Sequence, residues 1–201
     1  MEIKNIIFDF GDVLLDWNPR YLYEQHFEDK SEMDYFLNHI CNHDWNREQD
    51  RGRTFAEAVQ ILQKQYPEYH KQIALFDDCW DTMLKSDIPG TVEILDQVSK
   101  THHVFGLTNW SAEKIKIAYK RYDFLNQFDG IIVSGEEKLV KPDHRIYELL
   151  LQRFGIKAEE SLFIDDNIAN VEAARELGIH AIQFLDPQLL REELKRFNIL
   201  H

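Results

Sequence analysis

The sequence predicts a doubly wound α/β fold, in which a parallel, Rossmann-like sheet is covered by helices on both faces. Short apolar runs recur along the chain, at residues 3–10, 103–109, 130–135, 161–166 and 180–184. Each run except the last ends in a polar or glycine-containing turn that leads into a helical pattern. Strands that alternate with helices form parallel sheets, because a parallel neighbour is reached only through a crossover connection.

The helices that follow two of these runs have the clearest boundaries. Apolar residues between 146 and 154 fall at helical spacing, and Gly155 follows where a helix-ending glycine belongs. The stretch 168–177 has the same apolar periodicity and is followed by Gly178. Both helices therefore support the alternation of strand and helix.

A block of helical periodicity without a convincing strand separates the first two runs, from about residue 18 to residue 87. The segment "SDIPGT" (86–91) contains a proline and a glycine that mark the return to the sheet. We therefore expect an α/β core formed by residues 1–16 and 88–201. A small, all-helical cap formed by residues 17–87 is expected to be inserted after the first strand.

The excess of acidic residues limits the kinds of molecule that the chain can bind. The chain carries 36 acidic and 23 basic residues, a net charge of −13. Nucleic acids and anionic membranes are bound by clustered Lys and Arg, so this balance argues against both. An anionic small molecule stays compatible, because a metal ion or a lysine can invert the local field. With two cysteines and no leader pattern, we expect a cytoplasmic protein, monomeric or homodimeric, that acts on a small molecule.

Polar side chains stand at the ends of four predicted strands. They are Asp9, the pair Thr108 and Asn109, Lys141, and the pair Asp165 and Asp166. Taken singly, each has an ordinary explanation as a turn cap, a helix cap or a solvated loop charge. The carboxyl ends of parallel strands meet at one edge of the sheet, so we expect these side chains to converge there.

Their chemistry together is that of a cation and phosphate site. Asp9 and Asp166 offer hard oxygen ligands suited to Mg²⁺, which takes one or two carboxylates and leaves positions for water and phosphate. Lys141 would hold a substrate oxyanion and the Asp9 carboxylate in place. Thr108 and the backbone amides beside it would donate to phosphate oxygens. Asp9 could then attack phosphorus in line and form an aspartyl-phosphate.

In these motifs the sequence resembles the haloacid dehalogenase-like hydrolase superfamily, most of whose members are Mg²⁺-dependent phosphatases. Four signature positions occur in order: Asp9 in "FDFGDVL", Thr108 and Asn109 in "GLTN", Lys141 in "KP", and Asp165 and Asp166 in "FIDDN". The helical block is similar to the cap that this superfamily inserts after its first motif. The resemblance therefore implies a phosphoric monoester hydrolase.

The resemblance also implies a role for each matching residue. Asp9 is the nucleophile, Thr108, Asn109 and Lys141 bind phosphate, and Lys141 also stabilises the nucleophile. Mg²⁺ is held by Asp9, by the backbone carbonyl of Gly11 and by Asp166, whereas Asp165 acts through a metal-bound water.

Gly11 is a departure from the superfamily pattern, which usually has aspartate two positions after the nucleophile. Glycine keeps the backbone carbonyl but loses the side chain that serves as general acid, an aid worth about 10² to 10⁴ in rate. This favours substrates whose leaving group needs less protonation, such as an anomeric sugar phosphate or an acyl phosphate. Asp12 is a candidate replacement for the acid.

Two segments resemble one branch of the superfamily, the bacterial alpha-glucose-1-phosphate phosphatases. They are the opening "FDFGDVLLDWN", which has glycine at the same place, and the cap loop "DRGRTFAEA" (50–58). Arg51 and Arg53 of that loop are candidates for contact with the substrate.

Two other functions stay open from the sequence. In a 2-haloacid dehalogenase Asp9 would attack carbon and halide would leave without a proton, so Gly11 would be no handicap. That branch uses no metal, however, and three carboxylates that converge without a cation repel one another. The chain could also be a catalytically weak binding module that keeps the fold.

Overall fold

The protein is described here from a computed structural model, which describes residues 2–200. Its central sheet has the strand order β5-β4-β1-β6-β7, and every neighbouring pair is parallel. The strands are β1 (Asn5–Phe8), β4 (His103–Thr108), β5 (Gly130–Val133), β6 (Ser161–Asp165) and β7 (His180–Gln183). The prediction of a parallel α/β sheet is confirmed.

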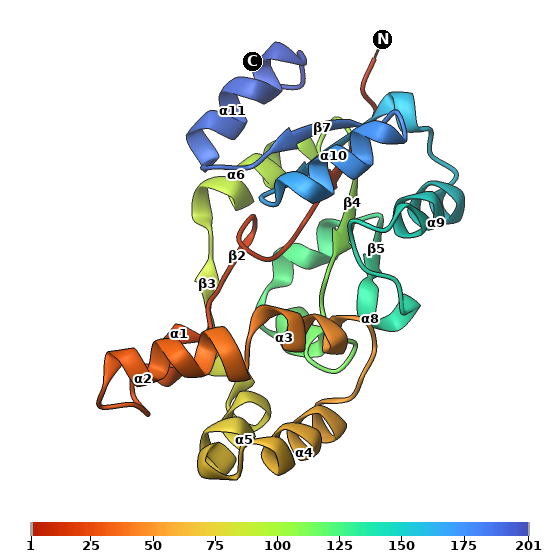
Figure 1. Cartoon of the computed structure of the whole chain (residues 1–201). Helices are drawn as coiled ribbons and strands as arrows, with labels where there is room; N and C mark the ends of the chain where they lie inside the picture. Colours follow the sequence, from red (N-terminus) through yellow and green to blue (C-terminus); the bar gives the residue numbers. More distant parts are fainter. Residues whose placement is uncertain (1, 201) are drawn as a thin grey trace.

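Helices cover both faces of this sheet, as a doubly wound fold requires (Figure 1). Along β1 the side chains alternate, so that Ile7 packs into the hydrophobic cluster on one face and Ile6 and Phe8 into that on the other. The first cluster is covered by α9 (His144–Phe154) and α10 (Ile168–Glu176). The second is covered by α6 (Pro89–Val98), α7 (Ile115–Arg121) and α11 (Pro187–Arg196).

The two helices that follow the Lys141 and Asp166 motifs begin at side-chain caps. Asp143 accepts a hydrogen bond from the backbone of Arg145 at the start of α9, and Asn167 accepts one from Ala169 at the start of α10. Helix α9 ends at Gly155, whose φ of 64° is the left-handed conformation that glycine adopts without strain. These caps fix where the chain turns away from the edge of the sheet.

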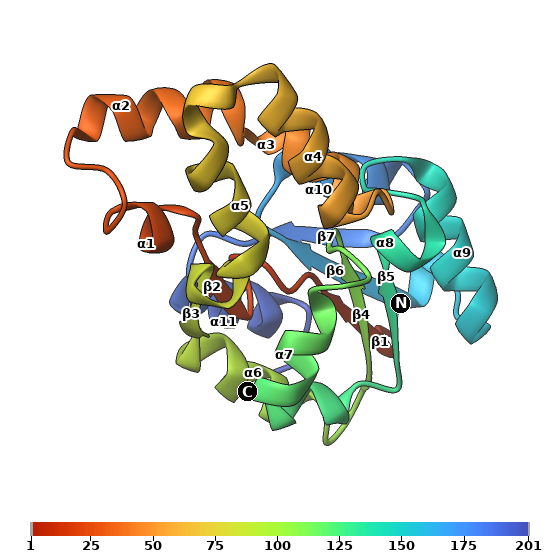
Figure 2. The same cartoon turned by 90° about the horizontal axis from the view of Figure 1, so that it is seen from below.

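The block between β1 and β4 is mainly helical, as predicted. Figures 1 and 2 show its helices gathered at one end of the sheet, away from the two chain termini. They are α1 (Arg20–Tyr23), α2 (Lys30–Tyr35), α3 (His43–Asp50), α4 (Phe55–Gln65) and α5 (His70–Asp78). Aromatic rings form their core, with Tyr23 and Phe36 4.9 Å apart between centroids. Of the helices in the described part of the chain, none is long and apolar enough to span a bilayer.

The expectation of no strand in residues 18–87 is wrong at the end of that range. Strands β2 (Leu15–Trp17) and β3 (Leu84–Asp87) form an antiparallel ribbon where the chain leaves the core and where it returns. Both strands are very short, and "LKSD" lacks the apolar alternation that reveals a strand in sequence. The predicted boundary at 16/17 falls within this ribbon and the one at 87/88 lies at its end. The division into core and cap stays a prediction.

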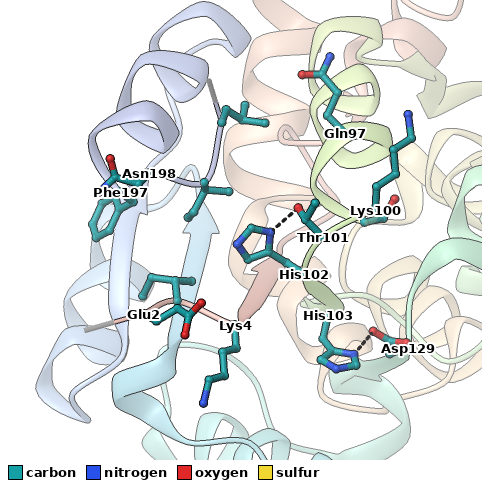
Figure 3. A pocket seen from close by; sticks show the side chains of 14 residues that line it. Glu2, Lys4, Gln97, Lys100, Thr101, His102, His103, Asp129, Phe197 and Asn198 are labelled. Carbon is teal, nitrogen blue, oxygen red and sulfur yellow. Dashed lines mark hydrogen bonds and ion pairs between the residues drawn. The ribbon is translucent and has the colours of Figure 1, made fainter.

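A wide hollow lies at the amino ends of β1 and β4, next to the C-terminal segment (Figure 3). Its wall includes Lys4, His102 and the pair of His103 and Asp129, whose Nδ1 and Oδ2 atoms are 3.1 Å apart. Among the described residues that line it, none belongs to the predicted site. The candidate site lies at the opposite, carboxyl end of the strands.

Candidate active site

Lys141 is the centre of the site. It lies in the loop before α9 and not, as the sequence predicted, at the end of a strand, because β5 already ends at Val133. Its Nζ atom lies 2.9 Å from Oδ1 of Asp9 and 2.7 Å from Oδ2 of Asp165, and it donates a hydrogen bond of 2.8 Å to the carbonyl of Leu107. An ammonium has three N–H donors, and three acceptors face this one. Because the side chain is fully buried, this pairing offsets the large cost of removing the charge from water.

Asp9 follows β1 and is held from both sides. Its backbone N–H donates to Ile164 of β6 at 2.9 Å, and its Oδ1 accepts a 2.7 Å hydrogen bond from the backbone of Phe10. Burial raises the pKa of Asp9 to about 8, with the charges of Asp165 and Asp166 acting in the same direction and Lys141 against them. Three carboxyl groups lie beside one ammonium here, so a bound cation would favour the ionised form of Asp9.

Asp165 is buried and fully engaged with its neighbours. Its Oδ1 accepts hydrogen bonds of 2.9 Å from the backbone of Asn167 and 2.9 Å from the side chain of Asn170, while Oδ2 faces Lys141. Asn170 was not identified from the sequence. Its one signal is a polar residue on the otherwise apolar, buried face of α10. The arrangement makes Asp165 a group that positions Lys141.

Asn109 also holds Lys141. Its Oδ1 accepts from the Lys141 backbone N–H at 2.8 Å, and its Nδ2 donates to the Lys141 carbonyl at 3.1 Å. The side chain is thereby committed to the protein, so phosphate recognition at Asn109 would fall to its backbone. Thr108 differs, because its hydroxyl is buried and finds no hydrogen-bond partner among residues 2–200. An unsatisfied buried hydroxyl costs about 1–3 kcal/mol, which a phosphate oxygen would relieve.

A metal ion fits the carboxylates of this site. Asp9, Asp165 and Asp166 each offer an oxygen, and these three atoms lie within 4.8 Å of one another. Oxygen-only donors beside a space for water and phosphate suit Mg²⁺. Asp165 already accepts from Lys141 and Asn170, whereas Asp166 is half-buried and lines the cavity described next.

A cavity of about 190 Å³ opens over these strand ends, and the helical block covers one side of it. Its core side includes Asp9, Gly11, Asp12, Asn109, Trp110, Asp166 and Asn170. The opposite side includes four polar residues of α3, namely His43, Asn46, Arg47 and Asp50, together with Trp17, Phe55 and Trp80. The α3 residues follow the spacing of one helical face, so a single polar face of this helix covers the cavity.

The cap residues that reach the cavity differ from those expected. Arg51 donates to Glu48, and Arg53 donates to Gln49 and to the carbonyl of Trp45; neither arginine is among the described residues that line the cavity. Arg47 lies there instead and donates to the Lys141 carbonyl at 3.1 Å. The sequence did not identify the α3 residues of the cavity, because it does not show which face of a polar helix points toward the sheet.

The space beside Gly11 is open. A Cβ atom placed on Gly11 would meet no atom within 4 Å among the described residues. The missing aspartate is therefore not excluded by packing. Asp12 lines the cavity as well, but it is exposed and its backbone has a φ of 55°.

Two curated relatives match nearly the whole chain. The sesquiterpene phosphatase astK of Aspergillus oryzae is 27% identical over 194 residues, which are 96% of this chain and 95% of that protein. A phosphorylated carbohydrates phosphatase of Thermotoga maritima is 26% identical over 193 residues, 90% of this chain and 84% of that protein. Drimenol cyclase drtB of Aspergillus calidoustus is also similar, at 27% over 186 residues, but the chain spans only 34% of its length.

Solved structures share the fold. The HAD family enzyme bt-2542 of Bacteroides thetaiotaomicron, solved with magnesium and inorganic phosphate, aligns with a TM-score of 0.70 at 24% identity over 92% of this chain and 95% of that chain. A dehalogenase aligns with a TM-score of 0.68 at 21% identity, over 90% and 84% of the two chains. At these identities the likeness establishes the fold and does not choose between phosphatase and dehalogenase.

A family model for haloacid dehalogenase-like hydrolases matches residues 6–184, which include all four motifs. Its match and the phosphatase relatives agree with the strand-end site built around Lys141. The chain belongs to the haloacid dehalogenase-like hydrolase family.

Proposed function

We propose that the chain is a Mg²⁺-dependent phosphatase that hydrolyses a small phosphorylated metabolite through an aspartyl-phosphate at Asp9. One observation carries this proposal. The buried ammonium of Lys141 holds the Asp9 carboxylate beside two further acids, Asp165 and Asp166. Asp9 lines a cavity in which a small substrate could bind. That arrangement suits a nucleophile that attacks a charged phosphoryl group.

Each residue of the site would have its own role in such a reaction. Lys141 and the Phe10 backbone N–H orient the Asp9 carboxylate toward the cavity. Thr108 supplies a hydroxyl for a phosphate oxygen, and Lys141 balances the negative charge near the nucleophile. Asp9, Asp166 and the Gly11 carbonyl would hold Mg²⁺, which neutralises charge on the phosphoryl oxygens when bound.

The walls of the cavity support a small organic group with both apolar and polar sides. The Trp17 and Trp80 rings stack with centroids 6.3 Å apart, and Trp80 and Trp110 lie 5.5 Å apart. The indole N–H groups of Trp17 and Trp110 find no partner among residues 2–200. Aromatic faces beside the polar face of α3 suit a sugar ring. A phosphorylated sugar is therefore the substrate class we propose, and the preference for a sugar 1-phosphate that Gly11 predicts applies only if no other residue supplies the acid.

A 2-haloacid dehalogenase is less well supported by this geometry. Its reaction needs no cation, yet Asp9, Asp165 and Asp166 approach one another around one ammonium. Like charges at this separation raise the free energy of the ionised site unless a cation joins them. A catalytically weak binding module is the remaining alternative.

The test is turnover of 4-nitrophenyl phosphate and of a panel of sugar phosphates, with and without added Mg²⁺. We expect Mg²⁺-dependent phosphate release that Asp9→Asn abolishes. The matched control is Asp44→Asn, which removes a carboxylate that is 93% exposed on α3. Halide release from 2-haloacids without metal would instead support the dehalogenase, and absence of any turnover would support the binding module.

A further inference from the structure

We propose that Asp50, the last residue of α3, is the acid that protonates the leaving-group oxygen, a role for which Gly11 has no side chain. The inference rests on the phosphatase proposed above. Asp50 lines the same small cavity as Asp9, and its carboxyl group accepts no hydrogen bond from the described residues. It is therefore free to face a substrate.

The backbone of Asp50 is tied to the core. Its carbonyl accepts a 2.6 Å hydrogen bond from the hydroxyl of Ser134, and that hydroxyl accepts a 2.9 Å hydrogen bond from the backbone of Trp110. Ser134 opens α8 (Ser134–Glu137), which lies beside α3 in Figure 1. The end of α3 is thus held against the loop that follows β4, and Asp50 has a fixed place over the site.

The surroundings of the Asp50 carboxyl suit a proton donor. Removal from water raises the pKa of Asp50 to about 7, while the positive charges of Arg47 and Lys141 act in the opposite direction. A general acid works best when its pKa lies near the pH of the reaction. Asp50 would therefore be partly protonated at neutral pH, as a leaving group requires.

Position distinguishes Asp50 from Asp12. Asp12 is next to Gly11 on the floor of the cavity and is exposed, whereas Asp50 belongs to the helix that covers the cavity. In-line attack by Asp9 places the leaving oxygen on the side of phosphorus opposite the nucleophile. That side faces the covering helices, where Asp50 lies.

The reaction balances with Asp50 in this role. As an Asp9 oxygen bonds to phosphorus, the bond from phosphorus to the leaving oxygen breaks, and the Asp50 proton passes to that oxygen to give the free alcohol. Asp50, now a carboxylate, takes a proton from the water that attacks the aspartyl-phosphate. Inorganic phosphate leaves, and both carboxyl groups return to their initial states.

The test compares two substrates of similar size, 4-nitrophenyl phosphate and phenyl phosphate, with Asp50→Asn. The nitrophenolate leaves without a proton, whereas the phenol is a poorer leaving group. We expect Asp50→Asn to lose about 10² in kcat/KM on phenyl phosphate, the lower end for general acid catalysis, and less than tenfold on 4-nitrophenyl phosphate. This parameter reports the steps up to the aspartyl-phosphate, so the later role of Asp50 in hydrolysis of that intermediate does not enter it. Asp44→Asn on the same helix is the control and should change neither rate.

A second variant separates lost chemistry from lost structure. Gly11→Asp places a carboxyl in the open space beside Asp9, and in the Asp50→Asn background it should restore most of the phenyl phosphate activity. Equal losses on both substrates, no loss on either, or the selective loss appearing with Asp12→Asn would overturn the assignment of Asp50 and leave the phosphatase standing. Failure of the unaltered chain to hydrolyse any phosphate ester of the panel would overturn both proposals.

Discussion

Lys141 and Asp165 form an ion pair of 2.7 Å in which neither side chain is exposed to solvent. Asn109 holds the lysine backbone and Asn170 holds the carboxylate, so both partners are fixed by amides that come from separate elements. The pair brings the ends of β4, β6 and the Lys141 loop together beneath Asp9. We therefore expect stability and catalysis to depend on the same contacts.

Lys141→Met is expected to damage both. Methionine fills a similar volume but leaves Asp9 and Asp165 buried without their cation, a change that costs about 3–5 kcal/mol for a buried pair. Urea unfolding would measure the loss, and turnover should vanish. Lys157→Met, at an exposed position, is the control. A loss equal to that of the control would show that the ion pair is not needed for the fold.

Asn170→Ala tests the support behind Asp165. The change removes the donor to both carboxylate oxygens and leaves a buried acceptor short of partners, at a cost of about 1–3 kcal/mol. Because Lys141 is then less well oriented, kcat should fall more than KM changes. Asn126→Ala, on the exposed surface, should alter neither stability nor kcat. Unchanged kcat in Asn170→Ala would contradict the role of Asp165 as a positioning group.

Mg²⁺ should stabilise the folded protein. A ligand that binds only the folded state at 100 times its Kd adds about 2.7 kcal/mol, which thermal unfolding detects as a higher Tm. Asp166→Asn should remove most of that increase, because it takes away a carboxylate from the group of three. If the variant gained as much as the unaltered protein, the ion would have to bind elsewhere.

The stability of the protein should carry a pH dependence from Asp50. Its pKa is about 7 when folded and lower when unfolded, so the folded state binds more protons between these values and loses stability as the pH rises. The charged groups that face it are Arg47 and Lys141. Asp50→Asn should therefore stabilise the protein more at pH 8 than at pH 5, by on the order of a few kcal/mol. Urea unfolding at both pH values measures the difference, and an equal effect at both would contradict it.

Gly135→Ala tests the packing of the loop after β4. An added Cβ would lie 2.5 Å from the backbone nitrogen of Ala112 and 2.8 Å from the carbonyl of Trp110, so that backbone must move. Overpacking of this kind costs about 1–3 kcal/mol. Gly11→Ala, which meets no described atom within 4 Å, should leave the free energy of unfolding unchanged. Equal free energies of unfolding for the two variants would show that the loop backbone moves without loss of stability.

The parts of the site that lie at strand ends were predictable from sequence, and the family match supports them. Parallel strands bring their carboxyl ends to one edge, so apolar runs that end at Asp9, Thr108 and Asp165 were enough to place these residues together. The short β2–β3 ribbon was not predictable, since its half-exposed strands have no apolar pattern and depend on each other across the chain.

The contacts that each residue of the site makes could be assigned only from the structure. The resemblance separates Asp166, as a metal ligand, from Asp165, but it does not show that Asp165 is turned inward to Asn170 and Lys141. In the same way, the cap residues over the cavity depend on which face α3 turns toward the sheet. That rotation is set by tertiary packing, so Arg47 and Asp50 could not be told from Arg51 and Arg53.

The most direct test of the account is rapid acid quenching of a single turnover, followed by mass analysis of the peptide that contains Asp9. We predict a phosphoryl group on Asp9 that forms and decays at rates consistent with phosphate release and is absent from Asp9→Asn. Phosphate release at the full rate with the Asp9 peptide unmodified at every quench time, or with the phosphoryl group on another residue, would contradict it.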